Sequence, residues 1–290
     1  MISVILTLST AFYAALYFEN KQRQRLSTAR MQQQSLAQNS LKDNIMSLSV
    51  LGTSDTSRNQ CMSYSSELKS CLWGDPRADK AIALVGGSHA EQWLAVINRF
   101  AQKNHYQVIQ INKGDCPLGG AEDSGPDCQI WTQKVIDYIA QHKNIKYVVT
   151  NSTRSYPDGQ REEVPQSYYS SFIALKKRSH AQIIGIRDNA RFDINPNQCL
   201  THPRKSSEQC NYPLYQHLAL KDPSLRYPNL ITSIDFSSLY CEDPKQCKLN
   251  ANNLPIYADD NHFSLIYVQQ IADQASQRLE TVIPPAHPHH

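Results

Sequence analysis

Three side chains from opposite ends of the chain have the types and order that acyl transfer requires. Ser88 follows two glycines, whereas Asp259 and His262 lie three residues apart near the end of the sequence. A serine becomes a nucleophile when a histidine takes its proton and a carboxylate orients that histidine. We therefore predict a triad of Ser88, His262 and Asp259 as nucleophile, base and orienting acid. Asp260 is the competing acid, and its alternative role is to cap a helix that begins near Phe263.

The segment around Ser88 is typical of a strand that ends in a glycine turn and leads into a helix. Residues 81–85 form an apolar run with the length of a buried parallel strand, and apolar residues then recur at helical spacing from Ala90 to Ala101. This order places the hydroxyl at the carboxyl edge of a sheet and at the positive end of a helix. A phosphate-binding loop is the other use of such a turn, but no Gly-Lys-Ser/Thr sequence follows.

The rest of the chain alternates predicted strands and helices. Further strands are expected at 107–112, 145–150, 181–186 and 229–236, and helices at 129–142, around 168–175 and at 265–279. This alternation predicts an α/β fold, a three-layer α/β/α sandwich with a mainly parallel sheet. The long polar segment 187–228 is interpreted as an excursion at the edge of the core. Ser88, Gly114 and Asn151 each follow a predicted strand, where parallel sheets bind ligands.

The motifs Gly-Gly-Ser-His-Ala at 86–90 and Asp-Asp-Asn-His-Phe-Ser at 259–264 resemble a known family. They are similar to the SGNH (GDSL-like) domain of bacterial membrane-bound acyltransferases (acyltransferase-3), which O-acylate surface polysaccharides. The resemblance covers about residues 79–279 and implies an SGNH domain over 60–283. It also implies an oxyanion hole made by the amides of Ser88 and Gly114.

Four positions depart from the family pattern or extend it. The usual Gly-x-Asn-Asp block is replaced after the third strand, where Asn151 is a candidate oxyanion donor. Arg154 is the alternative there, able to steady an oxyanion or a sugar hydroxyl. Gly87 stands where the family usually has an aspartate that braces the turn. His89 follows the serine as in the fused subfamily, and we expect it to pack or cap rather than catalyse.

The cysteines predict an oxidising compartment. The eight cysteines form four local couples, Cys61/Cys71, Cys116/Cys128, Cys199/Cys210 and Cys241/Cys247. An even count with short loops is typical of disulfides in an extracytoplasmic space, although other connectivities are possible. Zinc sites use two-residue knuckles or clustered histidines, which are absent, so we predict no metal site. The histidines of the tail, residues 284–290, are expected to be disordered and incidental.

Residues 2–18 are uncharged and mostly apolar, and they are followed by a basic cluster that begins at Lys21. We predict a transmembrane helix over 1–19, embedded in the bilayer through residues 2–18, and a juxtamembrane linker over 20–59. A cleaved signal peptide is the alternative, but no basic residue precedes the run and no small-x-small site comes after it. The basic cluster favours a cytoplasmic location for the C-terminal side of this helix, whereas the cysteines favour the periplasm. The resemblance resolves the conflict if the chain is the tail of a longer protein with upstream membrane helices.

The composition is that of a globular protein and indicates no particular function, so the functional prediction rests on the motifs. A net charge of +3 without a basic stripe argues against a nucleic-acid partner. The resemblance implies an O-acetyltransferase, anchored at the inner membrane, that acts on a polysaccharide such as lipopolysaccharide O-antigen. It implies no bound cofactor, because a membrane acyltransferase domain would deliver acetyl groups that originate from acetyl-CoA. The alternatives are a periplasmic carbohydrate acetylesterase and a carbohydrate-binding module with a degenerate SGNH fold.

Overall fold

The structure is a computed structural model of the 290-residue chain. It describes residues 19, 21–33, 35–37, 39–41, 61–121, 124–157 and 162–286. The predicted membrane segment 2–18 and residues 42–60 of the predicted linker lie outside this range. Among the described residues, none of the helices combines the length and apolar character that crossing a bilayer requires.

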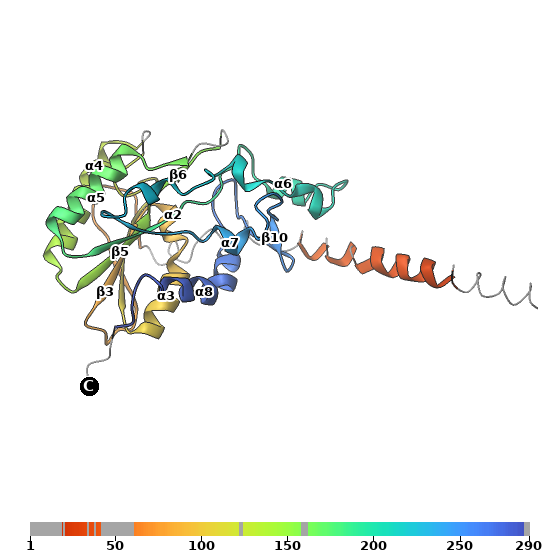
Figure 1. The fold of residues 1–290 in the computed structure, drawn as a ribbon, viewed down its shortest axis with the longest axis horizontal. Coiled ribbons are helices and arrows are strands. Elements are labelled where there is room, and N and C mark those ends of the chain that lie inside the picture. The colour runs from red at the N-terminus through yellow and green to blue at the C-terminus, as the bar shows by residue number, and fades with distance from the viewer. Residues whose placement is uncertain are drawn as a thin grey trace, which may run out of the picture.

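A seven-stranded sheet forms the centre of the domain (Figure 1). Its strands are β1 (Met62–Ser63), β2 (Cys71–Gly74), β3 (Ala81–Gly86), β4 (Gln107–Lys113), β5 (Ile145–Asn151), β8 (Gln182–Ile186) and β9 (Thr232–Ile234). The order is β1-β4-β3-β5-β8-β9 with parallel neighbours, and β2 pairs antiparallel with β4. The mainly parallel sheet is as predicted. The pairing of β1 and β2 with β4 was not predicted, because each is too short to show a strand period.

Helices cover both faces of this sheet. One face packs against α3 (Leu94–Asn104) and α8 (Leu265–Leu279), and the other against α4 (Pro126–Gln141) and α5 (Gln166–Arg178). Successive side chains of a strand point to opposite faces, so Ile82 and Leu84 join the first cluster and Ala83 and Val85 the second. Each layer is therefore closed by a hydrophobic core, and the α/β/α architecture is confirmed.

The helix predicted after Ser88 is broken into two. A short helix, α2 (Ser88–Glu91), is capped at its C-terminus by Gln92, and α3 begins at Leu94. Between them Trp93 is buried against the rings of Phe236 and Phe263, with centroid distances of 4.9 and 5.6 Å. The break lets one turn of helix point at the sheet edge while α3 runs along the sheet.

The segment that follows β8 is irregular, as expected for an excursion. It contains α6 (Asn197–Leu200) and three short 3-10 helices, Ser207–Cys210, Leu214–Gln216 and Pro223–Arg226. Two small hairpins, β6–β7 (Arg154–Ser155 with Glu162–Glu163) and β10–β11 (Asn250–Ala251 with Leu254–Pro255), and the helix α7 (Ser237–Tyr240) complete the domain.

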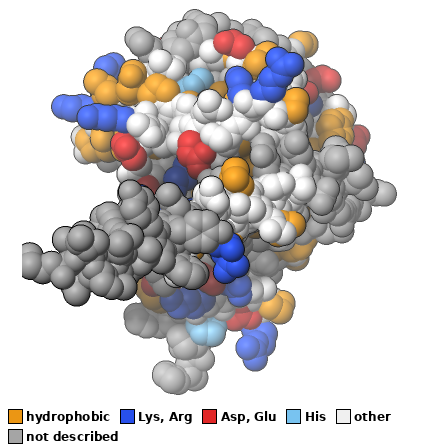
Figure 2. All heavy atoms as spheres, turned by 90° about the vertical axis from the view of Figure 1, so that its right-hand side faces the viewer, with side chains coloured by type: hydrophobic (Ala, Val, Ile, Leu, Met, Phe, Trp, Pro, Cys, Tyr) orange, Lys and Arg blue, Asp and Glu red, His pale blue; other side chains and the backbone are white. Residues whose placement is uncertain are grey.

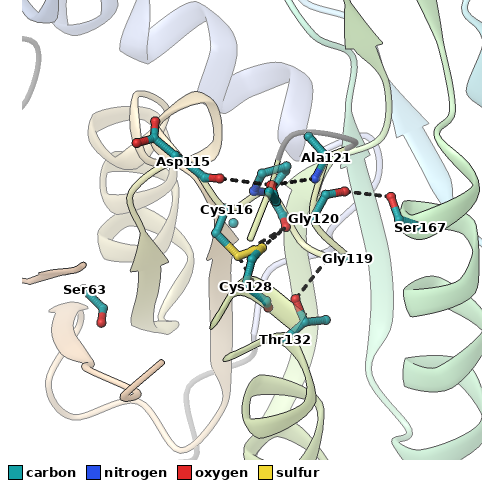
Figure 3. The surroundings of a disulfide bond; sticks show 12 residues. Ser63, Asp115, Cys116, Gly119, Gly120, Ala121, Cys128, Thr132 and Ser167 are labelled. Carbon is teal, nitrogen blue, oxygen red and sulfur yellow. Dashed lines mark hydrogen bonds between the residues drawn. A yellow bond between two sulfur atoms is a disulfide. The ribbon is translucent and has the colours of Figure 1, made fainter. Parts of the chain in front are cut away.

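All four predicted disulfides are present. The pairs are Cys61–Cys71, Cys116–Cys128, Cys199–Cys210 and Cys241–Cys247, and they leave no cysteine free. The first joins the segment before β1 to β2, so it holds both strands against β4. The second ties the loop after β4 to α4 (Figure 3).

The two ends of the described chain differ in how they contact the domain. Residues 21–33 are helical and exposed, and this helix projects away from the sheet (Figure 1), whereas Leu41 is only 3% exposed. At the other end, the Ala286 amide donates to the Asn104 carbonyl at 3.0 Å, and Ala286 is buried. Residues 284–286 thus pack on the domain, although the predicted disordered tail began at 284. Residues 287–290 lie outside the described range.

The described surface carries charges of both signs. Figure 2 shows Lys and Arg side chains interspersed with Asp and Glu on one face of the molecule. This mixture matches the small net charge of +3.

Candidate active site

The carboxyl ends of the central parallel strands meet at one edge of the sheet. In the register of the sheet, Gly86 of β3 pairs with Asn112 of β4, and Asn151 of β5 pairs with Ile186 of β8. The residues that come after these positions therefore converge, and Ser88 is among them.

Ser88, His262 and Asp259 form a continuous line of hydrogen bonds. The Nε2 atom of His262 lies 2.7 Å from the Ser88 Oγ, and its Nδ1 lies 2.8 Å from the Asp259 Oδ2. The other oxygen of Asp259 accepts the amides of Asn261 and His262 at 2.9 and 2.7 Å. A proton on Nδ1 donates to the carboxylate and leaves the Nε2 lone pair facing the serine hydroxyl.

The Asp259 carboxyl is ionised in this environment. Burial alone would raise its pKa, but the hydrogen bond and charge of His262 and two backbone amides outweigh that effect and lower the pKa to about 2. An ionised carboxylate at Nδ1 stabilises the positive charge that His262 acquires when it takes a proton.

Asp260 does not cap a helix, which was its alternative role. Its Oδ1 accepts the Asn261 side-chain amide at 3.2 Å. The N-cap of α8 is instead Ser264, whose hydroxyl oxygen accepts the Tyr267 amide. The expectation that Asp260 caps this helix is therefore wrong, because the helix begins several residues later.

The two glycines before Ser88 permit a tight approach of strand, helix and loop. Gly86 has a φ of +133°, which side chains rarely allow, and a Cβ there would lie 3.0 Å from the Ala90 Cβ. A Cβ on Gly87 would lie 3.3 Å from the backbone nitrogen of Pro117. A side chain at position 87 would therefore press on the backbone of the loop after β4.

Ser88 opens into a cavity of about 230 Å³. The loop after β4 forms one wall, and it is fixed by the Cys116–Cys128 disulfide and by hydrogen bonds from Ser167 to Gly120 and from Gly119 to Thr132 (Figure 3). The cavity is lined by Gly87, Ser88, His89, Asp115, Cys116, Pro117, Asn151, Thr153, Arg154, Tyr168, Asp188, Arg191, Asn261 and His262. A polar cavity of this size accommodates a small acyl group and part of a polar acceptor.

Asn151 is the predicted oxyanion donor that the structure brings to the cavity. It is 5% exposed, and within the described part of the chain its Nδ2 has no hydrogen-bond partner. An unsatisfied buried donor is costly and calls for an explanation such as an absent ligand. The Ser88 amide is another predicted donor. Ser88 is the first residue of α2, and amides in the first turn of a helix have no intrahelical acceptor.

Gly114 does not serve as predicted. Its amide donates to the Ser63 carbonyl of β1 at 2.9 Å, and a Cβ there would meet the Tyr64 ring. Gly114 is also not among the cavity-lining residues. The short strand β1, which the sequence did not predict, engages this amide and directs it away from Ser88.

Arg154 lies on the cavity wall, as the alternative prediction requires. Its guanidinium sits 5.6 Å from the centroid of the Tyr156 ring, in the geometry of a cation–π contact. This stacking orients the Arg154 side chain on the cavity wall.

Sequence reasoning missed two charged residues at the site, Asp188 and Arg191. Asp188 follows β8 by two residues and is buried beside His89, and Arg191 approaches it at 3.4 Å. Burial alone would raise the pKa of Asp188, but the charges of His89 and Arg191 together with hydrogen bonds hold it well below its usual value. The sequence signal that could have identified Asp188 was its position just after the carboxyl end of a strand. No cluster of three or more potential metal ligands occurs among the described residues.

The sheet, the serine turn after β3 and the Asp-x-x-His loop define an α/β domain of the SGNH class. The chain belongs to the family of SGNH domains fused to AT3 domains, whose model matches residues 54–277. The predicted family is thus confirmed. The chain is also similar in structure to the periplasmic domain of the lipopolysaccharide acetyltransferase of Salmonella ser. Paratyphi A, with a TM-score of 0.53 and 15% sequence identity. The match covers 69% of this chain and 83% of that one, and it shows a shared fold. A comparison with curated proteins gives no match.

Proposed function

We propose that the domain is an O-acyltransferase that carries an acetyl group on Ser88 and passes it to a hydroxyl of a cell-surface polysaccharide. The observation that supports this most is the 2.7 Å approach of His262 Nε2 to Ser88 Oγ, with Asp259 on the opposite ring nitrogen. Membership of a family whose SGNH domains are fused to AT3 domains supports acyl transfer as the chemistry.

The reaction takes place in two half-reactions with the same groups. His262 takes the Ser88 proton as Oγ attacks the acyl carbonyl, and returns it to the donor's leaving oxygen as that bond breaks. The acceptor hydroxyl then gives its proton to His262 and attacks the acyl–serine ester, and the proton returns to Ser88 Oγ. Asp259 stabilises the imidazolium in both halves.

The oxyanion formed in each half-reaction needs donors that are already in place. In this proposal the Ser88 amide and the Asn151 Nδ2 supply them. The orphaned Nδ2 of Asn151 supports the assignment, because a developing oxyanion would give this buried donor its missing partner.

The donor and the cellular location are taken from the family in this proposal. A membrane acyltransferase domain would deliver acetyl groups that originate from acetyl-CoA, and the SGNH domain would face it from the periplasm. Four disulfides support an oxidising compartment. Residues 2–18 would anchor the chain in the inner membrane. The shared fold with the periplasmic domain of a lipopolysaccharide acetyltransferase favours a surface glycan as acceptor.

A periplasmic carbohydrate acetylesterase is the second candidate, because water can replace the acceptor in the same cavity. The test supplies the full chain with an activated acetyl ester and an acceptor oligosaccharide, and measures acetyl-sugar and free acetate together. Transfer predicts acetyl-sugar that rises at the expense of acetate as acceptor increases. Arg154→Ala should weaken acceptor use while hydrolysis of the small ester continues, if Arg154 holds a sugar hydroxyl. Acetate alone at every acceptor concentration would make the protein an esterase.

A further inference from the structure

His89 is a buried, titratable side chain that the acyl-transfer steps do not use. It follows Ser88 in α2, and its ring centroid lies 4.9 Å from that of His262. Its Nδ1 lies 2.7 Å from the Asp188 Oδ1, and its Nε2 lies 3.1 Å from the Asn261 Oδ1. The ring therefore connects the segment after β8 with the loop that carries His262.

Asp188 fixes the orientation of this ring. The carboxylate also accepts the amide and the hydroxyl of Ser155, each at 3.1 Å, so it is held on both sides. Because a carboxylate only accepts, the proton of a neutral His89 lies on Nδ1. Burial first, and the charge of Arg191 second, lower the pKa of His89 and favour that neutral form. As placed, the Asn261 Oδ1 faces Nε2 while the Asn261 Nδ2 donates to the Asp260 Oδ1, so this bond needs a proton on Nε2, and a neutral His89 accepts from Asn261 only when the carboxamide is turned over.

A second connection runs parallel to the first. Gln92, the C-cap residue of α2 and three positions after His89, donates to the Asn189 Oδ1 at 2.8 Å and accepts the Phe263 amide at 3.0 Å. Asn189 in turn donates to the Asn261 carbonyl at 2.6 Å. Asn261 and Phe263, on either side of His262, are therefore both held in place. Their partners are side chains of the helical turn that begins at Ser88 and of the segment after β8.

Besides these links, the loop is held by a few hydrogen bonds of its own and by the Phe192 amide, which donates to the Asp260 carbonyl at 2.8 Å. Across the turn, the Ala258 amide donates to the His262 carbonyl at 2.8 Å, and the other internal bonds run to the side chains of Asp259 and Asp260. Loops position reactive groups less precisely than helices and strands do. An error of about 1 Å between reacting groups can lower a rate by about 100-fold.

We propose that His89 is a positioning residue, which acts through Asn261 to hold His262 within hydrogen-bonding distance of Ser88. The effect on turnover rests on the function proposed above, whereas the effect on loop geometry does not.

The kinetic test uses the full chain and hydrolysis of p-nitrophenyl acetate. His89→Ala should lower kcat by about 10- to 100-fold and change KM by less than about 3-fold, because the chemistry is misaligned and the cavity remains. His89→Gln, which can still bridge Asp188 and Asn261, should recover most of kcat with an unchanged pH profile. A His89→Gln variant as inactive as His262→Gln would make His89 a proton-transfer group and overturn the proposal.

A double-mutant cycle identifies the partner through which His89 acts. Asn261→Ala keeps the backbone bonds of the loop, so it should fold even if His89→Ala does not, and it should lower kcat to a similar extent. The double variant should be no slower than His89→Ala alone, because both changes break the same link. Independent, multiplying losses, or a fully active Asn261→Ala, would refute an action through Asn261.

A matched control and a structural readout complete the test. His105 forms a surface pair with Asp75 at 3.0 Å, and His105→Asn suits its positive φ of 59° and should leave kcat and KM unchanged. In a crystal structure of His89→Ala, the distance from His262 Nε2 to Ser88 Oγ should exceed 3.5 Å, beyond hydrogen-bonding range. If that distance stays at 2.7 Å the proposal is wrong. If wild type and Ser88→Ala hydrolyse the ester equally, the proposed function fails, and the crystal structure still decides the positioning role.

Discussion

The Nε2 of His262 lies 2.7 Å from the Oγ of Ser88, although 174 positions separate the two residues in the chain. The approach depends on two elements at one edge of the sheet: the turn between β3 and α2, and the loop before α8. If the two side chains work as one catalytic unit, as proposed, their losses should not multiply. Ser88→Ala and His262→Ala should each lower kcat by about 10⁴-fold or more, and the double variant should be no worse than either. Steady-state kinetics with p-nitrophenyl acetate gives the comparison. Multiplying effects would show that the residues act in separate steps.

Asn151→Ala should lower kcat by roughly 100-fold and leave KM nearly unchanged, since an oxyanion donor acts mainly in the transition state. Stability should stay the same or rise slightly, because the variant removes a buried donor that has no partner within the described chain. Thermal unfolding and ester hydrolysis, measured on one preparation, separate the two effects. Asn197→Ala is a useful contrast, because the Asn197 side chain donates to the Tyr257 carbonyl at 2.9 Å and its loss should cost stability. Unchanged turnover in Asn151→Ala would leave Asn151 as scaffold.

The Cys116–Cys128 disulfide should affect catalysis more than the Cys241–Cys247 disulfide. The first fixes the loop that forms a wall of the cavity, whereas none of the cavity-lining residues belongs to the second. Replacing either pair by serines should lower stability by about 2–5 kcal/mol. Only the Cys116→Ser/Cys128→Ser variant should also lower kcat per folded molecule. Equal kcat values for the two variants would mean that the loop keeps its position without its disulfide.

Acid should weaken the contribution of Asp259 to stability in a defined pH window. Its folded-state pKa is lowered from 3.8 to about 2, so the stabilisation is complete above the unfolded value and is lost as pH falls from 3.8 towards 2. The difference in unfolding free energy between wild type and Asp259→Asn should therefore shrink as the pH falls below about 4. Denaturant unfolding across this range provides the measurement. A difference that does not shrink between about pH 4 and pH 2 would contradict the lowered pKa of Asp259.

The sequence predicted those parts of the fold and site that depend on local pattern. The five central strands, the helix over 265–279, the cysteine couples and the convergence of Ser88 with the Asp259–His262 loop were all expected from apolar runs, spacing and chain order. Gly114 could not be assigned correctly, because its amide is engaged by β1, a two-residue strand without a detectable period. The roles of Asp188 and His89 depend on a contact across 99 positions, which no local pattern encodes.

The central claim is that Ser88 carries the acyl group, and direct observation of the acyl-enzyme tests it best. The full chain is mixed with an activated acetyl ester, quenched in acid within the first turnovers, digested and examined by mass spectrometry. We predict that the peptide containing Ser88 gains the mass of one acetyl group and loses it when the acceptor is added before the quench. His262→Ala should block the labelling. An unlabelled Ser88 peptide, together with a Ser88→Ala variant that still transfers acetyl groups at the wild-type rate, would contradict the account.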